Sequence, residues 1–424
     1  MSCHNESDVS VKIQSQNYIS HIIKLLTLTN RNNSKILPVE ADFCDLEKKI
    51  NDCDTAFTDV DECSTVALSS NPSSFSSIES FGEEDDSLYC PNNFKMVSVL
   101  GSGSFGTVYL AEYENQKKEK HVYAVKRLMK TKIHESQMAQ IMLEKQILMS
   151  ISDPFILRLH GTCQTNDELY FVTEALEHGD LYSAIYCGDK LTHEETVFYA
   201  ACIILGLDFI HSKKVVYRDL KPENIMIGPN GYLKIIDFGL AKQLPYMKLS
   251  EDKTLRKYTK CNTLCGTPEY VAPEIIMGNS YDGAVDIWAL GVIVYEMITR
   301  RTPFMVKQKD ADYITQMFTN IVLACKHGID IDVKLDRKTD GTPNARNLIT
   351  QLFNGKPERR VGRNKLPVSL LQHPYFTSLS MNPNDLYSQT YPAPILQPPF
   401  IGADIETAKA VEKYEGDQDI FKEF

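Results

Sequence analysis

A glycine-rich stretch between two alternating segments is the feature that most restricts how this chain can fold. It reads GSGSFG from Gly101 to Gly106 and follows FKMVSVL, which alternates in polarity like a half-buried strand. A dinucleotide-binding fold requires a helix after such glycines, whereas here TVYLAEY, Thr107 to Tyr113, alternates again and predicts a second strand. The glycines are therefore expected in a hairpin turn. Because they lack Cβ atoms, their backbone N–H groups can approach phosphate oxygens closely, with Phe105 at the tip to exclude water.

The sequence after this hairpin predicts a small β-rich lobe followed by a larger helical lobe. Further strands are expected at 121–128, 155–164 and 168–176, with a helix over 135–151 that carries Glu144. Beyond these strands the pattern becomes helical and includes one long apolar segment. We interpret Lys126 and Glu144 as an ion pair that would hold the phosphates of a nucleotide. A surface lysine whose stem packs on apolar neighbours is the alternative.

The stretch YRDLKPEN at 217–224 gathers the groups that phosphoryl transfer requires, and its proline excludes an ordinary helix interior. Asp219 could accept a proton from a hydroxyl, Lys221 could neutralise phosphate charge, and Asn224 offers a neutral oxygen to a hard metal ion. A hairpin after this stretch would bring Asp237 back beside Asn224. Taken alone, such a stretch is more often a solvated charged turn, so the rest of the chain has to decide.

The negative charge of the chain is concentrated in its first 90 residues. They hold 16 Asp and Glu against 6 Lys and Arg, a net charge of −10 out of −11 for the whole chain. A nearly neutral remainder does not favour nucleic acid as the main partner, because phosphate backbones attract basic surfaces. Eleven cysteines form no CxxC pair and no Cys/His metal spacing, which indicates reduced thiols. With no signal-peptide pattern and no apolar run near the ~20 residues that span a bilayer, we expect a cytoplasmic protein without an integral membrane segment, access to the nucleus being left open.

Three regions are expected along the chain: an acidic, serine-rich leader over 1–90, a folded domain over 91–376 and a tail over 377–424. The leader has a candidate short helix near 17–29, and the rest of it has the composition of a disordered segment. A flexible leader is one interpretation. A regulatory segment that docks its few apolar residues on the folded domain is the other.

The order of short motifs along the chain resembles that of the eukaryotic protein kinases. GSGSFGTV, AVK, YRDLKPEN, DFG, APE at 272–274 and DIW at 286–288 occur in this order, which is far more specific than any one motif. TLCGTPEY at 263–270 and the tyrosine of YRD are similar to the AGC group, which includes the cyclic-AMP-dependent and phospholipid-dependent kinases. The resemblance covers the folded domain and the last few residues. It implies an α+β, bilobal fold, with a β-rich N-lobe over about 91–176 and a mainly helical C-lobe over about 177–376.

This resemblance implies a serine/threonine protein kinase that transfers the γ-phosphate of ATP, bound with Mg²⁺, to protein substrates. Asp219 would position or deprotonate the substrate hydroxyl, and Lys221 would stabilise the transferring phosphoryl group. Asn224 and Asp237 would hold the metal ion. A lysine two residues after the catalytic aspartate indicates Ser or Thr as the acceptor. The positions implied to bind the nucleotide are Leu100, Gly101, Gly103, Ser104, Phe105, Gly106, Val108, Ala124, Lys126, Glu144, Thr173, Glu174, Leu176 and Met226.

The resemblance also implies a regulatory phosphorylation site in the segment between DFG and APE. Thr263 matches this site, and its phosphate would meet Arg218 and Lys242, which would order the segment. The helix position that often supplies a histidine to the phosphate is Gln140 here, so one contact departs from the family pattern.

Other charged positions are implied to serve substrate choice or structure. Asp180, Glu223 and Glu296 match acids that bind arginines before the target residue. Surface acids without this role are the alternative, since exposed ion pairs contribute only ~0 to 1 kcal/mol. Glu274 and Arg360 match a buried ion pair that supports the helical lobe.

The chain ends in IFKEF, which resembles the hydrophobic motif of AGC kinases. Phe421 and Phe424 would dock on the N-lobe and support the Glu144 helix, with a frayed terminus as the alternative. The rest of the tail has no clear nucleotide-contacting motif and no turn-motif phosphosite, which departs from the family. We expect a monomeric catalytic chain whose partners are protein substrates and an upstream activating kinase or a regulatory subunit. A pseudokinase scaffold is the alternative function, and the intact Lys126 and Asp219 argue against it.

Overall fold

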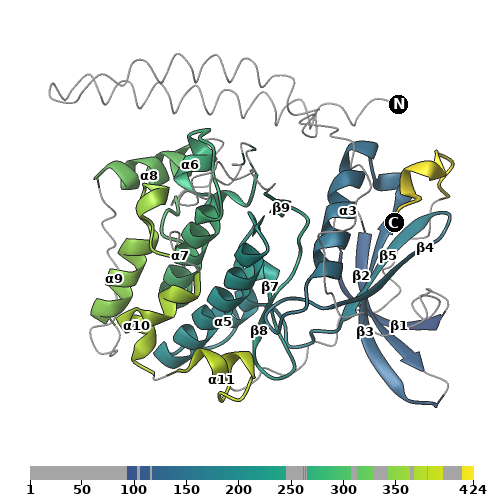
Figure 1. Ribbon diagram of the computed structural model, residues 1–424, viewed down its shortest axis with the longest axis horizontal. Coiled ribbons are helices and arrows are strands. Elements are labelled where there is room, and N and C mark those ends of the chain that lie inside the picture. Colours follow the sequence, from purple (N-terminus) through teal and green to yellow (C-terminus); the bar gives the residue numbers. More distant parts are fainter. Residues whose placement is uncertain are drawn as a thin grey trace, which may run out of the picture.

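The described part of the chain forms a β-rich lobe and a helical lobe that lie side by side (Figure 1). The computed structural model describes residues 93–102, 106–114, 117–244, 261, 263, 265–306, 313–327, 342–362, 367–379, 381–394 and 413–424. The acidic leader with its candidate helix, the tip of the glycine-rich turn and most of the segment before Thr263 lie outside these residues.

Five antiparallel strands form the sheet of the N-lobe, in the order β1-β2-β3-β5-β4. The hairpin of β1 and β2 flanks the glycine-rich turn, which confirms the sequence prediction that a strand follows the glycines. The bounds of the strands are Phe94–Ser102 (β1), Gly106–Glu114 (β2), Lys120–Met129 (β3), Leu159–Gln164 (β4) and Glu168–Glu174 (β5).

Helix α3, Glu135–Ser150, packs against this sheet and is the main helix of the N-lobe. Its first turn is closed by a capping box, in which the Gln137 side chain accepts the backbone N–H of His134 at 2.9 Å. Ile147 and Leu148 of the helix are buried in one cluster with Phe171 of β5. This packing fixes the position of Glu144 relative to the sheet.

The strand expected over 155–164 begins later than predicted, at Leu159. Ile235 of the C-lobe donates its N–H to Phe155 O at 2.8 Å, and Leu157 donates to Ile235 O at 3.0 Å. The backbone groups of 155–157 are thus used by a strand that is far away in sequence, so they cannot extend β4. This short pairing connects the end of α3 to the C-lobe.

Two buried helices, α5 (His193–Ser212) and α7 (Ala284–Thr299), form the centre of the C-lobe. Both are apolar on nearly every face, as expected of helices that are surrounded by protein. Among the described helices, α5 alone is long and apolar enough to cross a membrane, but 72% of its apolar window is buried inside the lobe. Such burial is typical of a core helix.

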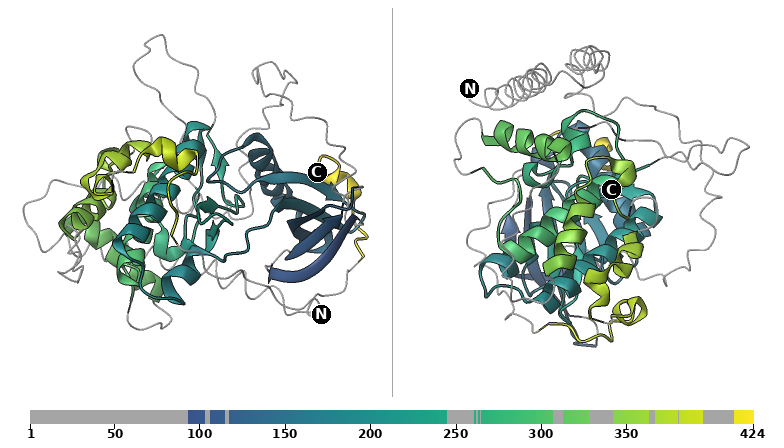
Figure 2. Two further views of the ribbon diagram at one scale, coloured as in Figure 1. Left: turned by 90° about the horizontal axis from the view of Figure 1, so that it is seen from below. Right: turned by 90° about the vertical axis from the view of Figure 1, so that its left-hand side faces the viewer.

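The remaining elements of the C-lobe surround this pair (Figure 2). Two sheets of two short strands each, β6–β9 and β7–β8, lie toward the N-lobe. The bounds are Leu181–Tyr186 (α4), Val215–Val216 (β6), Ile225–Ile227 (β7), Leu233–Ile235 (β8), Lys242–Gln243 (β9), Pro273–Ile276 (α6), Tyr313–His327 (α8), Thr342–Leu352 (α9), Pro374–Thr377 (α10) and Pro383–Tyr387 (α11), with 3₁₀ turns at Pro222–Asn224, Pro268–Tyr270, Pro357–Arg359 and Pro367–Gln372. Two further 3₁₀ turns, Lys130–Lys132 and Gln418–Phe421, lie at the N-lobe.

A buried ion pair joins distant parts of the C-lobe, as the resemblance implied. Arg360 donates to both carboxylate oxygens of Glu274, at 2.7 and 2.9 Å, and also to Ala284 O at 2.6 Å. Its guanidinium lies 5.2 Å from the centroid of a Trp288 ring. Every contact of this arginine is internal, so the pair supports the lobe and takes no part in chemistry.

Candidate active site

The loop at 217–224 is held from beneath by a single buried carboxylate on α7. Asp286 accepts the backbone N–H of Arg218 at 2.8 Å and that of Tyr217 at 3.0 Å, and lies 2.7 Å from His211 Nε2. Arg218 has a φ of 69°, a left-handed conformation that is unfavourable for a residue with a Cβ. The bonds to Asp286 stabilise this conformation. The sequence located the DIW motif but gave no role to Asp286, although an acid in a mainly apolar helix is a usable signal.

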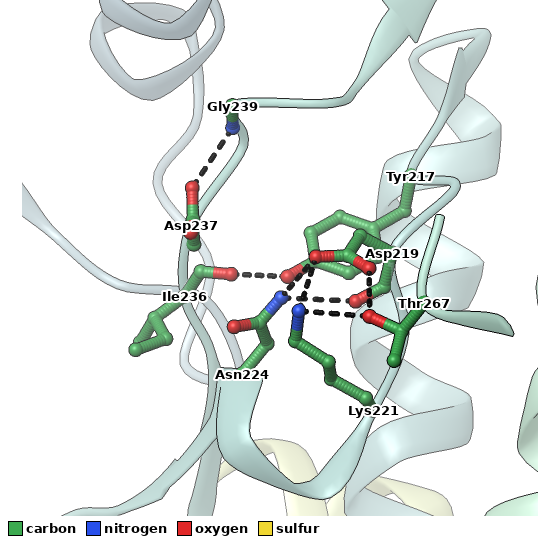
Figure 3. A network of polar contacts seen from close by, with 8 residues as sticks. All are labelled: Tyr217, Asp219, Lys221, Asn224, Ile236, Asp237, Gly239 and Thr267. Atoms are coloured by element: carbon green, nitrogen blue, oxygen red, sulfur yellow. Dashed lines mark hydrogen bonds and ion pairs between the residues drawn. The ribbon is translucent and has the colours of Figure 1, made fainter. Parts of the chain in front are cut away.

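Asp219 is the centre of a polar network formed by the loop and the 267–270 segment (Figure 3). Its Oδ1 accepts the Thr267 hydroxyl at 2.9 Å. Its Oδ2 accepts Lys221 Nζ at 2.7 Å and Asn224 Nδ2 at 2.9 Å. The loop therefore brings together the three residues that the sequence predicted. Thr267 is a fourth member that sequence reasoning missed, because it lies in another segment of the chain.

The hairpin of β7 and β8 returns the chain to the loop, as predicted. Ile236 donates its N–H to Asn224 O at 3.0 Å, so Asp237 follows directly beside Asn224. Figure 3 shows the Asn224 amide nitrogen toward Asp219 and its oxygen on the side of Asp237. Gly239 N–H donates to Asp237 Oδ1 at 3.0 Å and fixes that side chain. The Tyr217 ring packs edge-on against Phe238 at 5.3 Å, and both rings are fully buried.

The oxygens of Asn224 and Asp237 fit a magnesium ion. Mg²⁺ prefers hard oxygen ligands and commonly takes one or two carboxylates together with phosphates and water. The described residues contain no cluster of three or more His, Cys, Asp or Glu that could hold a metal by itself. A metal at this site would therefore depend on oxygens that a nucleotide brings.

Lys126 of β3 and Glu144 of α3 form the ion pair that the sequence predicted. Lys126 Nζ lies 2.7 Å from Glu144 Oε1, and the side chains are 32% and 7% exposed. Burial alone would lower the pKa of Lys126, but the carboxylates of Glu144 and Asp237 outweigh it and raise the pKa. The ammonium is therefore held in its charged form between the two lobes.

The predicted walls of a nucleotide pocket come from neighbouring strands. Val108 pairs with Lys126, and Ala124 with Thr173 in the sheet register. The Thr173 hydroxyl donates to Ala124 O at 3.3 Å, which orients it within the sheet. Leu100 is half-buried at the start of the glycine-rich turn. Leu176 is buried and Met226 half-buried.

The glycines of the turn have different requirements. A Cβ on Gly106 would lie 1.8 Å from Arg127 O, so glycine is needed here for the close approach of β3. A Cβ on Gly101 would meet nothing within 4 Å, which leaves open space at this position. Gly103, Ser104 and Phe105 lie outside the described residues.

Glu174 connects the pocket to the C-lobe through its side chain. Its carboxylate accepts Lys234 Nζ at 2.8 Å and Arg158 N–H at 2.8 Å. The acid is thus occupied by a β8 lysine and by the chain before β4. Its side chain therefore stabilises the connection between the lobes.

The surroundings of Thr263 are built from several elements. Thr263 is exposed, and its carbonyl accepts the Tyr281 hydroxyl at 2.8 Å. Arg218 Nη1 donates to the same Tyr281 hydroxyl at 3.3 Å, while its Nε donates to Leu240 O at 2.6 Å. Gln140, at the position where a histidine is common, donates to Ala241 O at 3.2 Å. Tyr281 is a contact that the sequence did not predict.

Lys242 lies on β9 and pairs with Val216 of β6, directly before the 217–224 loop. Burial raises the pKa of the Cys261 thiol, and the positive charges of Arg218 and, to a smaller extent, Lys242 oppose this rise. Both predicted basic residues therefore act on the described residues around Thr263. Most of the long segment before Thr263 lies outside the described residues.

The three acids that the resemblance assigned to substrate lie in different environments. Glu223 lies within the 217–224 loop and is exposed, whereas the Asp180 carboxylate caps α4 by accepting Ser183 N–H at 2.7 Å. Glu296 is only 1% exposed and accepts hydroxyls from Tyr186 at 2.6 Å and Tyr270 at 2.8 Å. The sequence gave no sign of this burial. Its role in reading a substrate stays a prediction.

The last residues of the chain are docked on the N-lobe, beside α3 and β4 (Figures 1 and 2). Phe421 is 1% exposed and lies with its ring 4.6 Å from Lys130 Nζ. Phe424 is 8% exposed, packs edge-on against Phe171 at 5.2 Å and lies 5.0 Å from Lys145 Nζ. This arrangement agrees with the docking expected from the FxxF sequence. Because Lys145 follows Glu144 on α3, the tail contacts the helix that carries the ion pair.

Comparisons with known proteins agree with this geometry. A family model described as Protein kinase domain matches residues 94–376. The RAC serine/threonine-protein kinase of Drosophila melanogaster is 36% identical over 77% of this chain and 48% of its own length. The RAC family serine/threonine-protein kinase homolog of Dictyostelium discoideum is 33% identical, over 73% and 62%. The ribosomal protein S6 kinase alpha-6 of Danio rerio is 33% identical, over 73% and 38%.

The chain thus spans between 38% and 62% of the length of these three relatives. The matched region contains both lobes and every described residue of the polar network around Asp219. The chain belongs to the protein kinase family, within its AGC group of serine/threonine kinases.

Proposed function

We propose that this chain transfers the γ-phosphate of ATP, bound with Mg²⁺, to serine or threonine hydroxyls of protein substrates. The observation that carries the proposal is the convergence of two sets of groups. Lys126, Glu144 and Asp237 lie on one side, and Asp219 and Lys221 on the other, joined through Asn224. A pseudokinase scaffold would have no need to keep both sets.

The proposed chemistry assigns each group a task at a stated atom. A substrate hydroxyl at Asp219 would replace one of the donors that Oδ1 and Oδ2 now accept, and would pass its proton to that carboxylate. Lys221 would then place its ammonium on the oxygens of the transferring group, and Lys126 on the remaining phosphates. Asn224 and Asp237 would hold a Mg²⁺ ion, whose charge would neutralise that of the phosphates.

We also propose a preference for basic residues before the acceptor. Glu223 is an exposed residue of the 217–224 loop, and Glu269 lies in the segment that carries Thr267. Carboxylates pair strongly with guanidinium groups, whose flat fork matches two oxygens. These two acids, together with Asp180 at the start of α4, are the candidates for reading such residues.

Phosphorylation of Thr263 is the proposed means of activation. The position of Arg218 supports this role. Its guanidinium donates to the Tyr281 hydroxyl, which in turn donates to the Thr263 carbonyl. A phosphate dianion would add charge-assisted hydrogen bonds to a cation that is already oriented by Leu240 O. Because Arg218 precedes Asp219, the phosphate would act on the catalytic loop directly.

A transfer assay with matched peptides tests the proposal. Radiolabelled ATP and Mg²⁺ are supplied with basic peptides that are identical except for Ser, Thr or Tyr at the acceptor position. Label should appear on the Ser and Thr peptides and stay at background on the Tyr peptide. A chain that binds ATP but labels none of them would be a scaffold, and labelling of Tyr alone would contradict the assigned acceptor class.

A further inference from the structure

Glu296 is a buried acid that lies close to the substrate-facing segments without being open to them. Tyr270, which donates to one of its oxygens at 2.8 Å, closes the segment that begins with Thr267. The hydroxyl of Thr267 in turn contacts Asp219 at 2.9 Å. The acid therefore contacts the end of the segment whose first residue, Thr267, contacts Asp219.

The second oxygen of Glu296 is occupied from the opposite side. Tyr186, the last residue of α4, donates its hydroxyl to Glu296 Oε1 at 2.6 Å. The pair of tyrosines leaves the carboxylate 1% exposed. Neither donor carries a charge, so a negative group on α7 is satisfied by two neutral hydroxyls.

This arrangement differs from the one that a cation would favour. A guanidinium is charged and can bond to both oxygens of a carboxylate at once, so it pairs more strongly with a carboxylate than a neutral phenol does. Burial raises the pKa of Glu296, the two tyrosine hydroxyls lower it, and the nearby Glu223 and Glu269 raise it further. The three carboxylates thus repel one another, and an arginine between them would relieve that repulsion.

We propose that Tyr186 is a specificity-determining residue, which withholds Glu296 from the substrate by occupying one of its two oxygens. The inference rests on the proposed protein kinase activity and refines it. A substrate arginine could use Glu296 only by displacing a buried phenol hydroxyl, which would then lose its partner. In this chain, recognition of basic residues therefore falls to Glu223, Glu269 and Asp180, and Glu296 joins α4, α7 and the 267–270 segment.

The test compares paired serine peptides that carry Arg or Ala at each position before the acceptor in turn. The measured quantity is the ratio of kcat/KM for the Arg peptide to that for the Ala peptide, which does not depend on the fraction of active enzyme. Tyr186→Phe frees one oxygen of Glu296 and should raise this ratio about tenfold at one position, equivalent to ~1.4 kcal/mol. Tyr182→Phe is the matched control. Tyr182 lies one turn earlier on α4, with its ring 4.6 Å from that of Tyr186, and is 42% exposed.

A second substitution identifies the acid responsible for the change. Adding Glu296→Gln to Tyr186→Phe should return the ratio to the wild-type value, and thermal unfolding shows whether each variant is folded. An unchanged or lower ratio in Tyr186→Phe at every position would overturn the proposal, as would a gain that survives Glu296→Gln. Absence of transfer by the wild-type chain to any peptide would instead contradict the proposed kinase activity, and the role of Tyr186 with it.

Discussion

At the scale of single residues, the site depends on charges that are held by other charges. The ammonium of Lys126 is kept protonated by Glu144 on one side and by Asp237 on the other. The Asp219 carboxylate is held by a lysine, an amide and a hydroxyl. Such fixed groups cost little reorganisation when a charged substrate binds, which is the usual basis of electrostatic catalysis.

Lys126→Met should remove the contact to nucleotide phosphates and leave the buried Glu144 without its cation. We expect kcat/KM for ATP to fall at least about a hundredfold, measured by transfer assays and by nucleotide titration. Lys120→Met is the matched control, because Lys120 lies on the same strand with its side chain 63% exposed and should change neither value. Normal ATP affinity in Lys126→Met would show that this ammonium does not hold the phosphates.

A second residue-scale prediction concerns Asp153, between α3 and β4. Burial and the nearby Asp208 raise its pKa to about 6, against the opposing effects of the Phe155 N–H and Lys234. Between its ordinary value of 3.8 and about 6, the folded protein therefore binds more protons than the unfolded chain. The free energy of unfolding then decreases as the pH rises through this window, and the loss persists above it.

Asp153→Asn removes this charge and keeps an oxygen that can accept the Phe155 N–H, a bond of 2.9 Å in the wild type. At pH 8 we expect the free energy of unfolding to rise by roughly 1–2 kcal/mol, after allowance for solvent screening. The difference should disappear near pH 4. Asp189→Asn, at an exposed acid, serves as the control. Equal stabilities of Asp153→Asn and wild type at pH 8 would contradict the effect of burial.

At the scale of elements, the segment around Thr263 is tied to the catalytic loop through Tyr281. The Tyr281 backbone pairs with that of Cys261. The Tyr281 hydroxyl donates to Thr263 O and accepts a hydrogen bond from the Arg218 guanidinium. Tyr281 thus holds the segment at Cys261 and at Thr263. A phosphate on Thr263 would strengthen an existing connection to Arg218.

Thr263→Ala should therefore lower kcat by roughly ten- to hundredfold, because the phosphate can no longer bond to Arg218. Phosphatase treatment provides the internal comparison. The treated wild type should fall to the activity of Thr263→Ala, and the variant itself should be insensitive to the phosphatase. Full activity of the treated wild type would exclude this threonine as the activating site.

At the scale of the whole molecule, the last residues of the chain dock the C-terminal tail on the N-lobe. Phe421→Ala with Phe424→Ala should lower the free energy of unfolding by at least about 2 kcal/mol. This is less than the ~3–5 kcal/mol of a Phe in a closed core, because the tail can undock while the lobe stays folded. Activity should fall several-fold as α3 loses this support. Lys422→Ala with Glu423→Ala, both exposed, is the matched control and should change neither. Equal Tm and activity in both double variants would count against docking.

Most of the fold and of the catalytic site could be predicted from the sequence, because motif order and hydrophobic period are local properties of the chain. The hairpin around GSGSFG and the return of Asp237 to Asn224 follow from turn length and alternation. What the sequence could not predict is which distant residues occupy a given backbone or side-chain group in the folded protein. Ile235 takes the backbone groups of the expected strand at 155–157, and two tyrosines remove Glu296 from the surface. Both depend on residues far apart in sequence.

The most direct test of the account is transfer of radiolabelled phosphate by the wild-type chain and by Asp219→Asn, measured with the same basic serine peptide. The amide introduced by this substitution keeps the shape of the side chain but cannot accept the proton of the substrate hydroxyl. We predict robust transfer by the wild type and a loss of at least about a thousandfold in the variant, with ATP affinity nearly unchanged. Comparable transfer by the two proteins would contradict the assignment of Asp219, and with it the active site described around the YRDLKPEN loop.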